Sequence, residues 1–372
     1  MNAHFSTAAR EQYATPSRMP SDVERSRAAL ASWLLGEHVQ VAVGAHAGAI
    51  AGWVDREGQA SYVYPEITGY YLQWLAWHAA CHGADNDTRR RAAAAQRWLL
   101  LWAFGAETPP TRVYFEPAMP DWRNSALFFF DLAMVLRGLA SATRLGLIEA
   151  DPKLVARISE LLRRLVADDG MFDACVAVRT DGKLRDRWST RRGAFLSKAA
   201  SGVLIGAAQF PSLPKPLARA ADATFAAALE SMSRESHSET HPLLYGIEGA
   251  LSLPEHPAAV AALPHMVRQL RELLERSTQL GHIPESLGGG RVRLDVVAQA
   301  IRAAALLLAG DVDQMQQVLV HYIDPERGIS FSPDARPLQY SVWTAMFAEQ
   351  ALFGAECGAR DALPPEFRRC LV

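Results

Sequence analysis

The sequence predicts an all-α fold, an (α/α)6 toroid of about twelve helices with short β-hairpins at the rim of a pocket. Helical periodicity dominates the chain from residue 21 onward, and the predicted helices alternate in kind. Every second one is apolar or small nearly all round, as in ITGYYLQWLAW and YSVWTAMFAEQAL, whereas those between them mix apolar and charged residues. Since a helix without a polar face is buried on all sides, the alternation indicates an inner ring of helices wrapped by an outer ring.

The helices are delimited by ordinary start and stop signals. Acids and hydroxyls at helix starts cap free N–H groups, and glycine ends helices by adopting a left-handed conformation. The candidate starts are Ser21, Asp87, Asp121, Asp151 and Asp311, and the candidate stops are Gly83, Gly146 and Gly310. The expected helices lie near residues 21–36, 66–83, 87–105, 122–145, 151–167, 193–209, 213–232, 241–252, 256–278, 293–309, 311–322 and 339–356.

Glycine-led connections recur before the inner helices, at residues 48–53, 170–174, 281–285 and 328–331. This is a repeat of supersecondary structure rather than of residues. Residues 55–58 and 179–182 have the composition of hairpin turns, the second one between strands at 174–180 and 183–190. Such hairpins would project on the side where the inner helices begin and would build the rim of the pocket.

The composition bounds the class of protein. The chain has 372 residues, 49% of them hydrophobic and 21% charged, with a net charge of -2, as in a globular protein with a sizeable core. We expect residues 1–20 to be a mobile N-terminal leader and residues 21–372 to be a single toroid domain, because no long linker interrupts the repeat. The balanced charge argues against a nucleic-acid partner. Without a signal peptide or a long apolar run, no transmembrane segment and a cytoplasmic location are expected.

The sequence contains no metal or cofactor motif that we recognise. Its four cysteines are far apart and lack ligand spacing, as is typical of free thiols in a reducing compartment. Phosphate-binding loops, dinucleotide fingerprints, zinc-protease motifs and nucleophile elbows are missing. We therefore expect neither a metal nor a cofactor.

Polar and aromatic residues gather at the predicted N-terminal ends of the inner helices, which would meet at one mouth of a ring. Flat rings beside carboxylate, amide and guanidinium groups are typical of a carbohydrate site. Glu66 and Asp121 supply carboxylates there. The candidates for substrate binding are Tyr64, Tyr70, Arg123, Asn124, Trp188, Arg191, His241, Tyr245, Arg293, Asp295, Tyr340 and Trp343.

Structural roles remain open for several of these residues. An acid at a helix start is favourable by about 0.3–1 kcal/mol through the helix dipole alone. Capping is therefore an alternative for Glu66, Asp121 and Asp295, and the arginines at 187–192 could form a solvated rim. The charged residues inside the apolar helices are also ambiguous, because they could form ion pairs between inner helices or line the pocket floor. They are Asp131, Lys198, Glu248, Arg302 and Glu349.

Over residues 21–356 the pattern resembles the six-hairpin glycosidase superfamily, which includes hydrolases, sugar epimerases and polysaccharide lyases. The stretch Glu66-Ile67-Thr68-Gly69-Tyr70 has the spacing found around the general acid of glycoside hydrolase family 8, although Tyr-Pro precedes it and no Thr-Asp-Ala-Asp run follows. The resemblance implies Glu66 as a general acid and Asp121 as the base that activates water, with inversion. Arg123, Arg191 and Arg293 would favour an anionic sugar such as a uronate.

We therefore predict a carbohydrate-active enzyme, foremost a glycoside hydrolase that acts on an oligosaccharide or glycoconjugate through paired carboxylates. A uronate lyase or sugar epimerase on the same fold would instead use His241, Tyr245 or Tyr340 for proton transfer. A non-catalytic glycan-binding protein or an accessory protein of polysaccharide biosynthesis is the third possibility, because a fold does not determine function.

Overall fold

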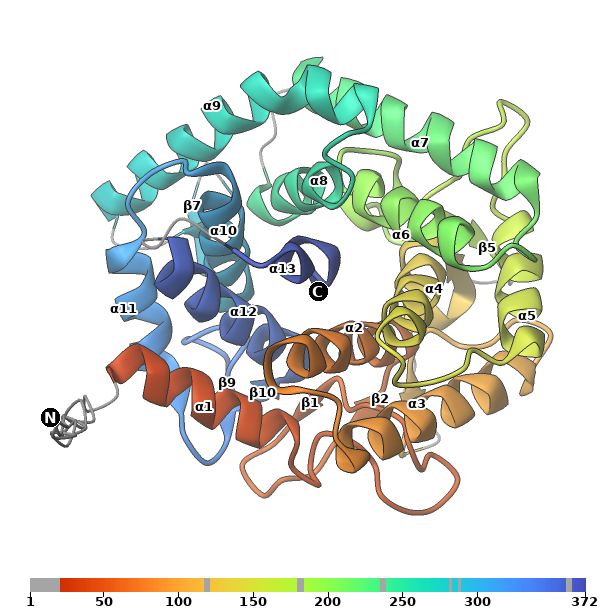
Figure 1. Cartoon of the computed structure of the whole chain (residues 1–372), viewed down its shortest axis with the longest axis horizontal. Helices are drawn as coiled ribbons and strands as arrows, with labels where there is room; N and C mark the ends of the chain where they lie inside the picture. Colours follow the sequence, from red (N-terminus) through yellow and green to blue (C-terminus); the bar gives the residue numbers. More distant parts are fainter. Residues whose placement is uncertain are drawn as a thin grey trace, which may run out of the picture.

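The computed structural model describes residues 21–116, 121–178, 184–234, 239–280, 283–286, 289–358 and 363–372. Within these ranges the helices form two concentric rings (Figure 1). The inner ring consists of α2 (Pro65–His82), α4 (Phe129–Arg144), α6 (Leu196–Gln209), α8 (Thr240–Ser252), α10 (Leu294–Leu307) and α12 (Val342–Gly358). The outer ring consists of α1 (Asp22–Leu34), α3 (Asn86–Phe104), α5 (Pro152–Arg163), α7 (Lys215–Arg234), α9 (Pro257–Leu280) and α11 (Asp313–Tyr322).

The inner helices contact one another in chain order, and α12 returns to contact α2, so the ring closes. The short helix α13 (Pro365–Arg369) lies across the middle of the view in Figure 1 and contacts α2 and α8. Outer helices bury a single face, as α5 does with Leu154, Ile158 and Leu161. The predicted (α/α)6 toroid is confirmed.

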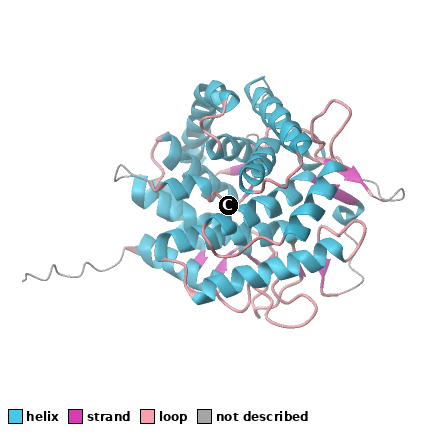
Figure 2. Ribbon diagram, turned by 45° about the vertical axis from the view of Figure 1, so that its right-hand side comes forward, coloured by secondary structure: helices cyan, strands magenta, loops and turns pink. Residues whose placement is uncertain are grey.

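Short antiparallel strand pairs connect the helices (Figure 2). The pairs are β1 (Trp53–Val54) with β10 (Tyr340–Ser341), β2 (Tyr62–Val63) with β3 (Val113–Tyr114), β4 (Ala126–Phe128) with β5 (Cys175–Ala177), β6 (Pro284–Ser286) with β7 (Gly289–Val292), and β8 (Ile323–Asp324) with β9 (Gly328–Ile329). The first pair joins the two ends of the ring, with Trp53 opposite Ser341. The predicted turn at residues 55–58 is present, because the Asp55 amide donates to the Gln59 carbonyl over 3.0 Å.

Three local predictions are wrong. The helix expected from residue 122 begins only at Phe129, because residues 122–125 form a 3-10 helix, η1 (Trp122–Ser125), and β4 follows it. Strand β5 pairs with β4 rather than with residues 183–190. The proposed leader at 1–20 and the second hairpin turn, residues 179–182, lie outside the described residues. Similarly, β10 occupies the start of the last expected inner helix, so α12 begins at Val342.

A buried ionic cluster links three inner helices at the centre of the ring. Glu248 of α8 accepts from the Lys198 ammonium of α6 at 2.7 Å, and its other oxygen contacts the Arg302 guanidinium of α10. Gln299 donates to Glu248 over 3.1 Å. All four side chains are fully buried, so the predicted ion pairing is confirmed for Lys198, Glu248 and Arg302. Asp131 does not join this cluster but faces the pocket.

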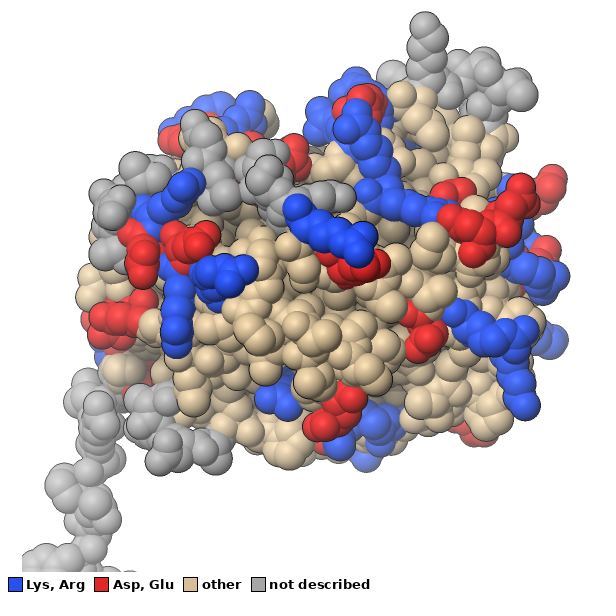
Figure 3. Space-filling model, turned by 90° about the horizontal axis from the view of Figure 1, so that it is seen from above, with Lys and Arg blue, Asp and Glu red and all other residues tan. Residues whose placement is uncertain are grey.

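The described surface carries both signs of charge. Figure 3 shows acidic and basic side chains beside one another over the face seen from above. Among the described helices, none combines the length and the apolar character that a bilayer span needs.

Candidate functional site

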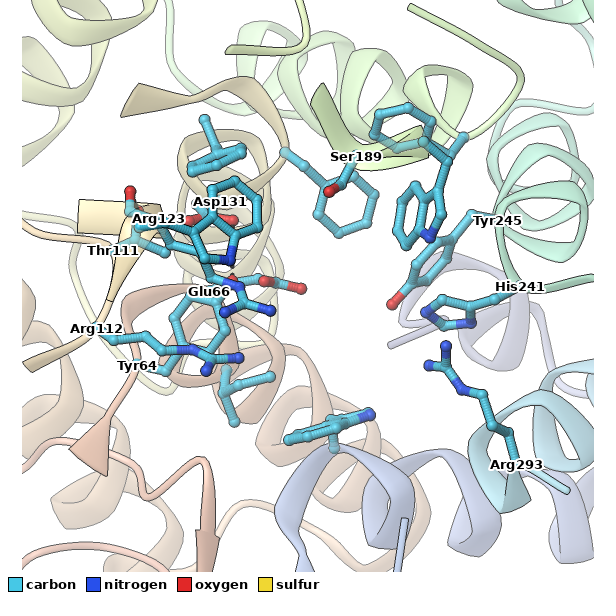
Figure 4. A pocket seen from close by; sticks show the side chains of 17 residues that line it. Tyr64, Glu66, Thr111, Arg112, Arg123, Asp131, Ser189, His241, Tyr245 and Arg293 are labelled. Atoms are coloured by element: carbon cyan, nitrogen blue, oxygen red, sulfur yellow. Dashed lines mark hydrogen bonds between the residues drawn. The ribbon is translucent and has the colours of Figure 1, made fainter. Parts of the chain in front are cut away.

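A pocket opens where the inner helices begin. It is lined by residues from the starts of α2, α4, α8 and α12, from the segments that lead into these helices and from those that lead into α6 and α10 (Figure 4). The predicted convergence of helix ends therefore occurs. The lining residues are Tyr64, Glu66, Ile67, Thr111, Arg112, Trp122, Arg123, Phe128, Phe130, Asp131, Trp188, Ser189, Phe195, His241, Tyr245, Arg293 and Trp343.

Two carboxyl groups meet in this pocket. Glu66 stands in the first turn of α2, directly after Pro65, and Asp131 stands in the first turn of α4. Glycines let the two helices touch: a Cβ on Gly69 would lie 2.5 Å from the Met134 carbonyl oxygen. This close backbone contact places the carboxyls of Glu66 and Asp131 within hydrogen-bond distance of each other.

The Glu66–Asp131 pair binds a proton more tightly than isolated carboxyls do. Burial raises the pKa of both groups, and the neighbouring charge of Glu66 raises that of Asp131 further. Tyr64 donates to Asp131 Oδ1 over 3.3 Å. Within the described part of the chain, no N–H or alcohol group donates a hydrogen bond to Asp131 Oδ2. The Asp131 carboxyl instead shares a hydrogen bond with Glu66, so we treat the two carboxyls as one titrating unit.

Asp121 occupies a different place. It caps η1 by accepting from the Arg123 amide at 3.0 Å, and it accepts from the Tyr114 hydroxyl at 2.9 Å. Arg112 and Arg123 pair with it at 3.4 and 3.2 Å. Although burial opposes the shift, the Arg123 amide and the two guanidinium charges lower the pKa of Asp121. The residue is not among those that line the pocket, so its predicted role as a base remains a prediction.

Asp295 likewise lies behind the pocket wall. Its buried carboxylate accepts from Arg293 at 3.1 and 2.7 Å and from the Trp343 indole at 3.1 Å. Both partners line the pocket. Asp121 and Asp295 thus orient guanidinium groups on two sides of the cavity, and each arginine keeps further N–H donors for a ligand.

His241 is a neutral side chain in the wall opposite Glu66 (Figure 4). Burial, aided by the charge of Arg293, lowers the pKa of His241 to about 3. Its Nδ1 lies 2.6 Å from Gln299 Oε1. The ring is also held by Tyr245, with centroids 4.2 Å apart, and by the edge of Trp188 at 5.7 Å.

The remaining candidates are spread around the site. Tyr70 is fully buried below the pocket, and Asn124 exchanges hydrogen bonds of 2.8 and 2.9 Å with the Arg112 backbone. Arg191 is exposed and pairs with Asp186 outside the pocket. Tyr340 belongs to β10 and lines a separate surface depression.

Sequence reasoning left Asp131 open between an ion pair and the pocket floor and did not name it as a catalytic candidate; the structure places it in the pocket lining. The signal was available in FFFDLAM, an acid inside an apolar run. The helix start predicted at residue 122 placed Asp131 deep in the helix rather than at its head. Arg112, which lies over the ring of Tyr62 at 4.5 Å, was not named among the substrate-binding candidates, although it precedes the expected fourth helix.

No protein-family model and no curated protein matches the sequence. Solved structures do match. The chain is similar to a sugar epimerase from a ruminal bacterium, with a TM-score of 0.66 and 10% identity over 92% of this chain and 100% of that one. It is also similar to an unsaturated glucuronyl hydrolase, responsible for the degradation of glycosaminoglycan, from Bacillus sp. GL1. That match has a TM-score of 0.63 and 13% identity and covers 88% of this chain and 96% of that one.

A D-mannose isomerase is similar to the same extent, with a TM-score of 0.62 and 12% identity over 91% of this chain and 99% of that one. At such identities the likeness concerns the fold. These neighbours are toroids of inner and outer helices that cover nearly the whole described ring. The chain therefore has the (α/α)6 toroid fold that its sequence predicts.

Proposed function

We propose that this protein is a carbohydrate-active enzyme, a glycoside hydrolase whose acid and base are Glu66 and Asp131. The observation that carries the proposal is the pair itself: two buried carboxyls with raised pKa values sharing a hydrogen bond in the pocket. Perturbed carboxyls of this kind cluster at catalytic sites. The buried carboxylate of Glu248 is matched by two cations, whereas the raised pKa values of Glu66 and Asp131 favour a shared proton that the pair can transfer.

Hydrolysis leaves the number of protons on such a pair unchanged. The neutral carboxyl donates its proton to the glycosidic oxygen as the C–O bond breaks. The ionised carboxyl accepts a proton from the water whose oxygen bonds to the sugar carbon. The products together gain one water, and the pair again holds one proton, now on the other carboxyl.

The geometry differs from that of separated acid and base. Carboxyls in a retaining pair lie about 5–5.5 Å apart and those in an inverting pair about 6.5–9.5 Å. Glu66 and Asp131 are close enough to share a hydrogen bond, so we propose that they act as one unit on one side of the substrate, like the paired acids of aspartic proteases. Asp121 as base is the competing proposal, because the resemblance to family 8 implies it.

The residues that line the pocket favour a sugar that carries a negative charge. Trp122, Trp188 and Trp343 offer flat apolar faces for stacking. Arg112, Arg123 and Arg293 line the same pocket. Since guanidinium groups bind carboxylates bidentately, we propose an oligosaccharide or glycoconjugate containing a uronate as the substrate.

A second function is favoured by one specific observation. His241 is neutral and lies in the pocket beside Tyr245. A neutral imidazole can remove a proton from carbon, as an epimerase or isomerase requires. The sugar epimerase and the D-mannose isomerase on the same fold make this the natural alternative.

A product-mass screen separates these functions. Purified protein is incubated with neutral and uronate-containing oligosaccharides in water enriched in heavy oxygen, and the products are weighed by mass spectrometry. Hydrolysis adds one heavy water, lysis leaves an unsaturated sugar that absorbs in the ultraviolet, and epimerisation leaves the mass unchanged. We expect water addition that is abolished by Glu66→Gln and by Asp131→Asn.

Control variants locate the base. Glu255→Gln, an exposed change far from the pocket, should leave turnover intact. Asp121→Asn should raise KM by disturbing Arg112 and Arg123 while preserving catalysis. Turnover that survives Asp131→Asn but not Asp121→Asn would overturn our assignment and support Asp121 as the base. Isomerised product lost only in His241→Phe would support the epimerase.

We also propose a cytoplasmic location. Four widely spaced cysteines, none of them in a disulfide in the described structure, fit a reducing compartment. Cell fractionation with antibody detection tests this, and recovery in the medium or in an oxidising compartment would contradict it.

A further inference from the structure

A hydrogen-bond relay reaches from the buried ionic cluster to the pocket wall. Glu248 is held ionised because the charges of Arg302 and Lys198 outweigh the effect of burial and lower the pKa of Glu248. An ionised carboxylate only accepts hydrogen bonds. The end of the Gln299 side chain that faces Glu248 at 3.1 Å must therefore be its NH2 group. This fixes the orientation of the amide, which the positions of its heavy atoms alone do not.

The fixed amide then determines the state of His241. With its NH2 on Glu248, Gln299 presents Oε1 to His241 Nδ1 at 2.6 Å. An amide oxygen only accepts, so Nδ1 must carry the proton. In a neutral imidazole the other nitrogen, Nε2, then has the free lone pair. A second proton is disfavoured, since the ring is 6% exposed and the Arg293 guanidinium lies beside it.

Nε2 is the ring nitrogen that remains for a ligand. It makes no hydrogen bond with the described residues, and the His241 side chain lines the pocket opposite Glu66 (Figure 4). Arg293 beside it carries donors only, whereas the Tyr245 hydroxyl can both donate and accept. The indole N–H of Trp343 is already bonded to Asp295. A sugar hydroxyl approaching this wall therefore finds guanidinium donors for its oxygen and, in Nε2, a nitrogen acceptor for its hydrogen.

We propose that Glu248 and Gln299 lock His241 in the Nδ1–H tautomer so that Nε2 permanently accepts a hydrogen bond from one substrate hydroxyl. Gln299 is a positioning residue in this arrangement, and His241 is the residue that determines specificity. The identity of the ligand rests on the proposed function, whereas the tautomer does not. A site that hydrogen-bonds a particular hydroxyl rejects the deoxy analogue strongly, because the acceptor would be left buried and unpaired.

Nitrogen NMR tests the tautomer directly. Long-range 15N–1H correlations on histidine-labelled protein distinguish Nδ1–H from Nε2–H rings. The chain has 11 histidines, and His241→Phe identifies the signals of interest by their loss. We expect the Nδ1–H pattern in the wild type and a shift toward Nε2–H in Gln299→Leu, which removes the acceptor.

Gln73→Leu is the matched control. Gln73 is a fully buried glutamine of the inner ring whose one hydrogen bond, to Gly69, lies away from His241. It should leave the His241 pattern unchanged. A wild-type ring that is Nε2–H or doubly protonated overturns the proposal, and so does an unchanged pattern in folded Gln299→Leu.

The ligand is tested with D-glucuronate as the probe. Titration should shift the Nε2 signal of the wild type, and the affinity should fall about 10-fold or more in Gln299→Leu, which corresponds to one lost hydrogen bond to a buried acceptor. Removing one hydroxyl of the sugar should weaken binding to the wild type by a similar factor but leave binding to Gln299→Leu unchanged.

An Nε2 signal that does not move at saturating glucuronate overturns the hydroxyl contact. Equal losses of affinity for every deoxy sugar in the wild type and in Gln299→Leu overturn it as well. Failure of the proposed hydrolysis gives a different result, in which the probe shifts Nε2 but no substrate gains water. The two proposals therefore fail separately.

Discussion

Replacing Gly69 by alanine should separate α2 from α4 and break the Glu66–Asp131 hydrogen bond. The added Cβ would lie 2.5 Å from the Met134 carbonyl oxygen, where ordinary contact begins at 3.4 Å, so the helices must move apart by about 0.9 Å. A carboxyl–carboxylate hydrogen bond of about 2.7 Å would lengthen to about 3.6 Å, which is no longer a hydrogen bond. Overpacking of this kind costs about 1–3 kcal/mol of stability.

Two measurements check this prediction. Denaturant unfolding should show the loss of stability, and 13C NMR of labelled carboxyl groups should show Glu66 and Asp131 titrating more independently than in the wild type. Gly193→Ala is the matched control, because a Cβ there meets its nearest atom, on Phe195, only at 3.9 Å. An unchanged unfolding midpoint together with an unchanged carboxyl titration in Gly69→Ala would refute the close helix contact and the argument built on it.

Three further predictions concern buried polar groups. Burial raises the pKa of Glu349 from 4.5 to about 7, so the folded state binds the extra proton and stability should fall by about 3 kcal/mol as the pH rises from about 4.5 to 7. In thermal unfolding measured over this pH range, the stability of Glu349→Gln should depend less on pH than that of the wild type, whereas the stability of Glu255→Gln should not. Equal slopes of stability against pH in the wild type and Glu349→Gln would contradict the pKa shift. Glu248→Gln should cost about 3–5 kcal/mol in urea unfolding, because two buried cations lose their anion; a cost below 1 kcal/mol would argue against the ionic cluster. Trp343→Phe removes the indole donor of Asp295 and should cost about 1 kcal/mol of stability, and a variant as stable as the wild type would exclude this hydrogen bond.

The architecture could be predicted from sequence because its signal is repeated. Six segments without a polar face cannot all be surface helices, and this argument does not depend on the boundaries of any one of them. The position of Glu66 was equally accessible, since Pro65 sets the helix start locally. Burial of Glu248 in an ion pair followed from its apolar surroundings and the cost of an unpaired charge.

The pocket position of Asp131, the proposed partner of Glu66, was harder to predict because long-range pairing determines it. Residues 122–128 read as a helix start, yet β4 pairs with β5, some fifty residues along the chain, and this tertiary contact overrides local propensity. The helix head consequently moves to Phe129 and brings Asp131 into the pocket. Asp121 pairs with Arg112 and Arg123. The residues next to Asp121 in the sequence do not predict its pairing with Arg112.

The seam where β1 meets β10 has a consequence for the order of folding. Trp53 pairs with Ser341, and the pocket needs both Glu66 near one end of the ring and Trp343 near the other. Bringing such distant segments together has a large loop-closure entropy. During synthesis the early hairpins can stack on one another as they emerge, but the site has no far wall until the last inner helix docks. We expect binding competence to be acquired in a single late step and to be lost first when this seam opens.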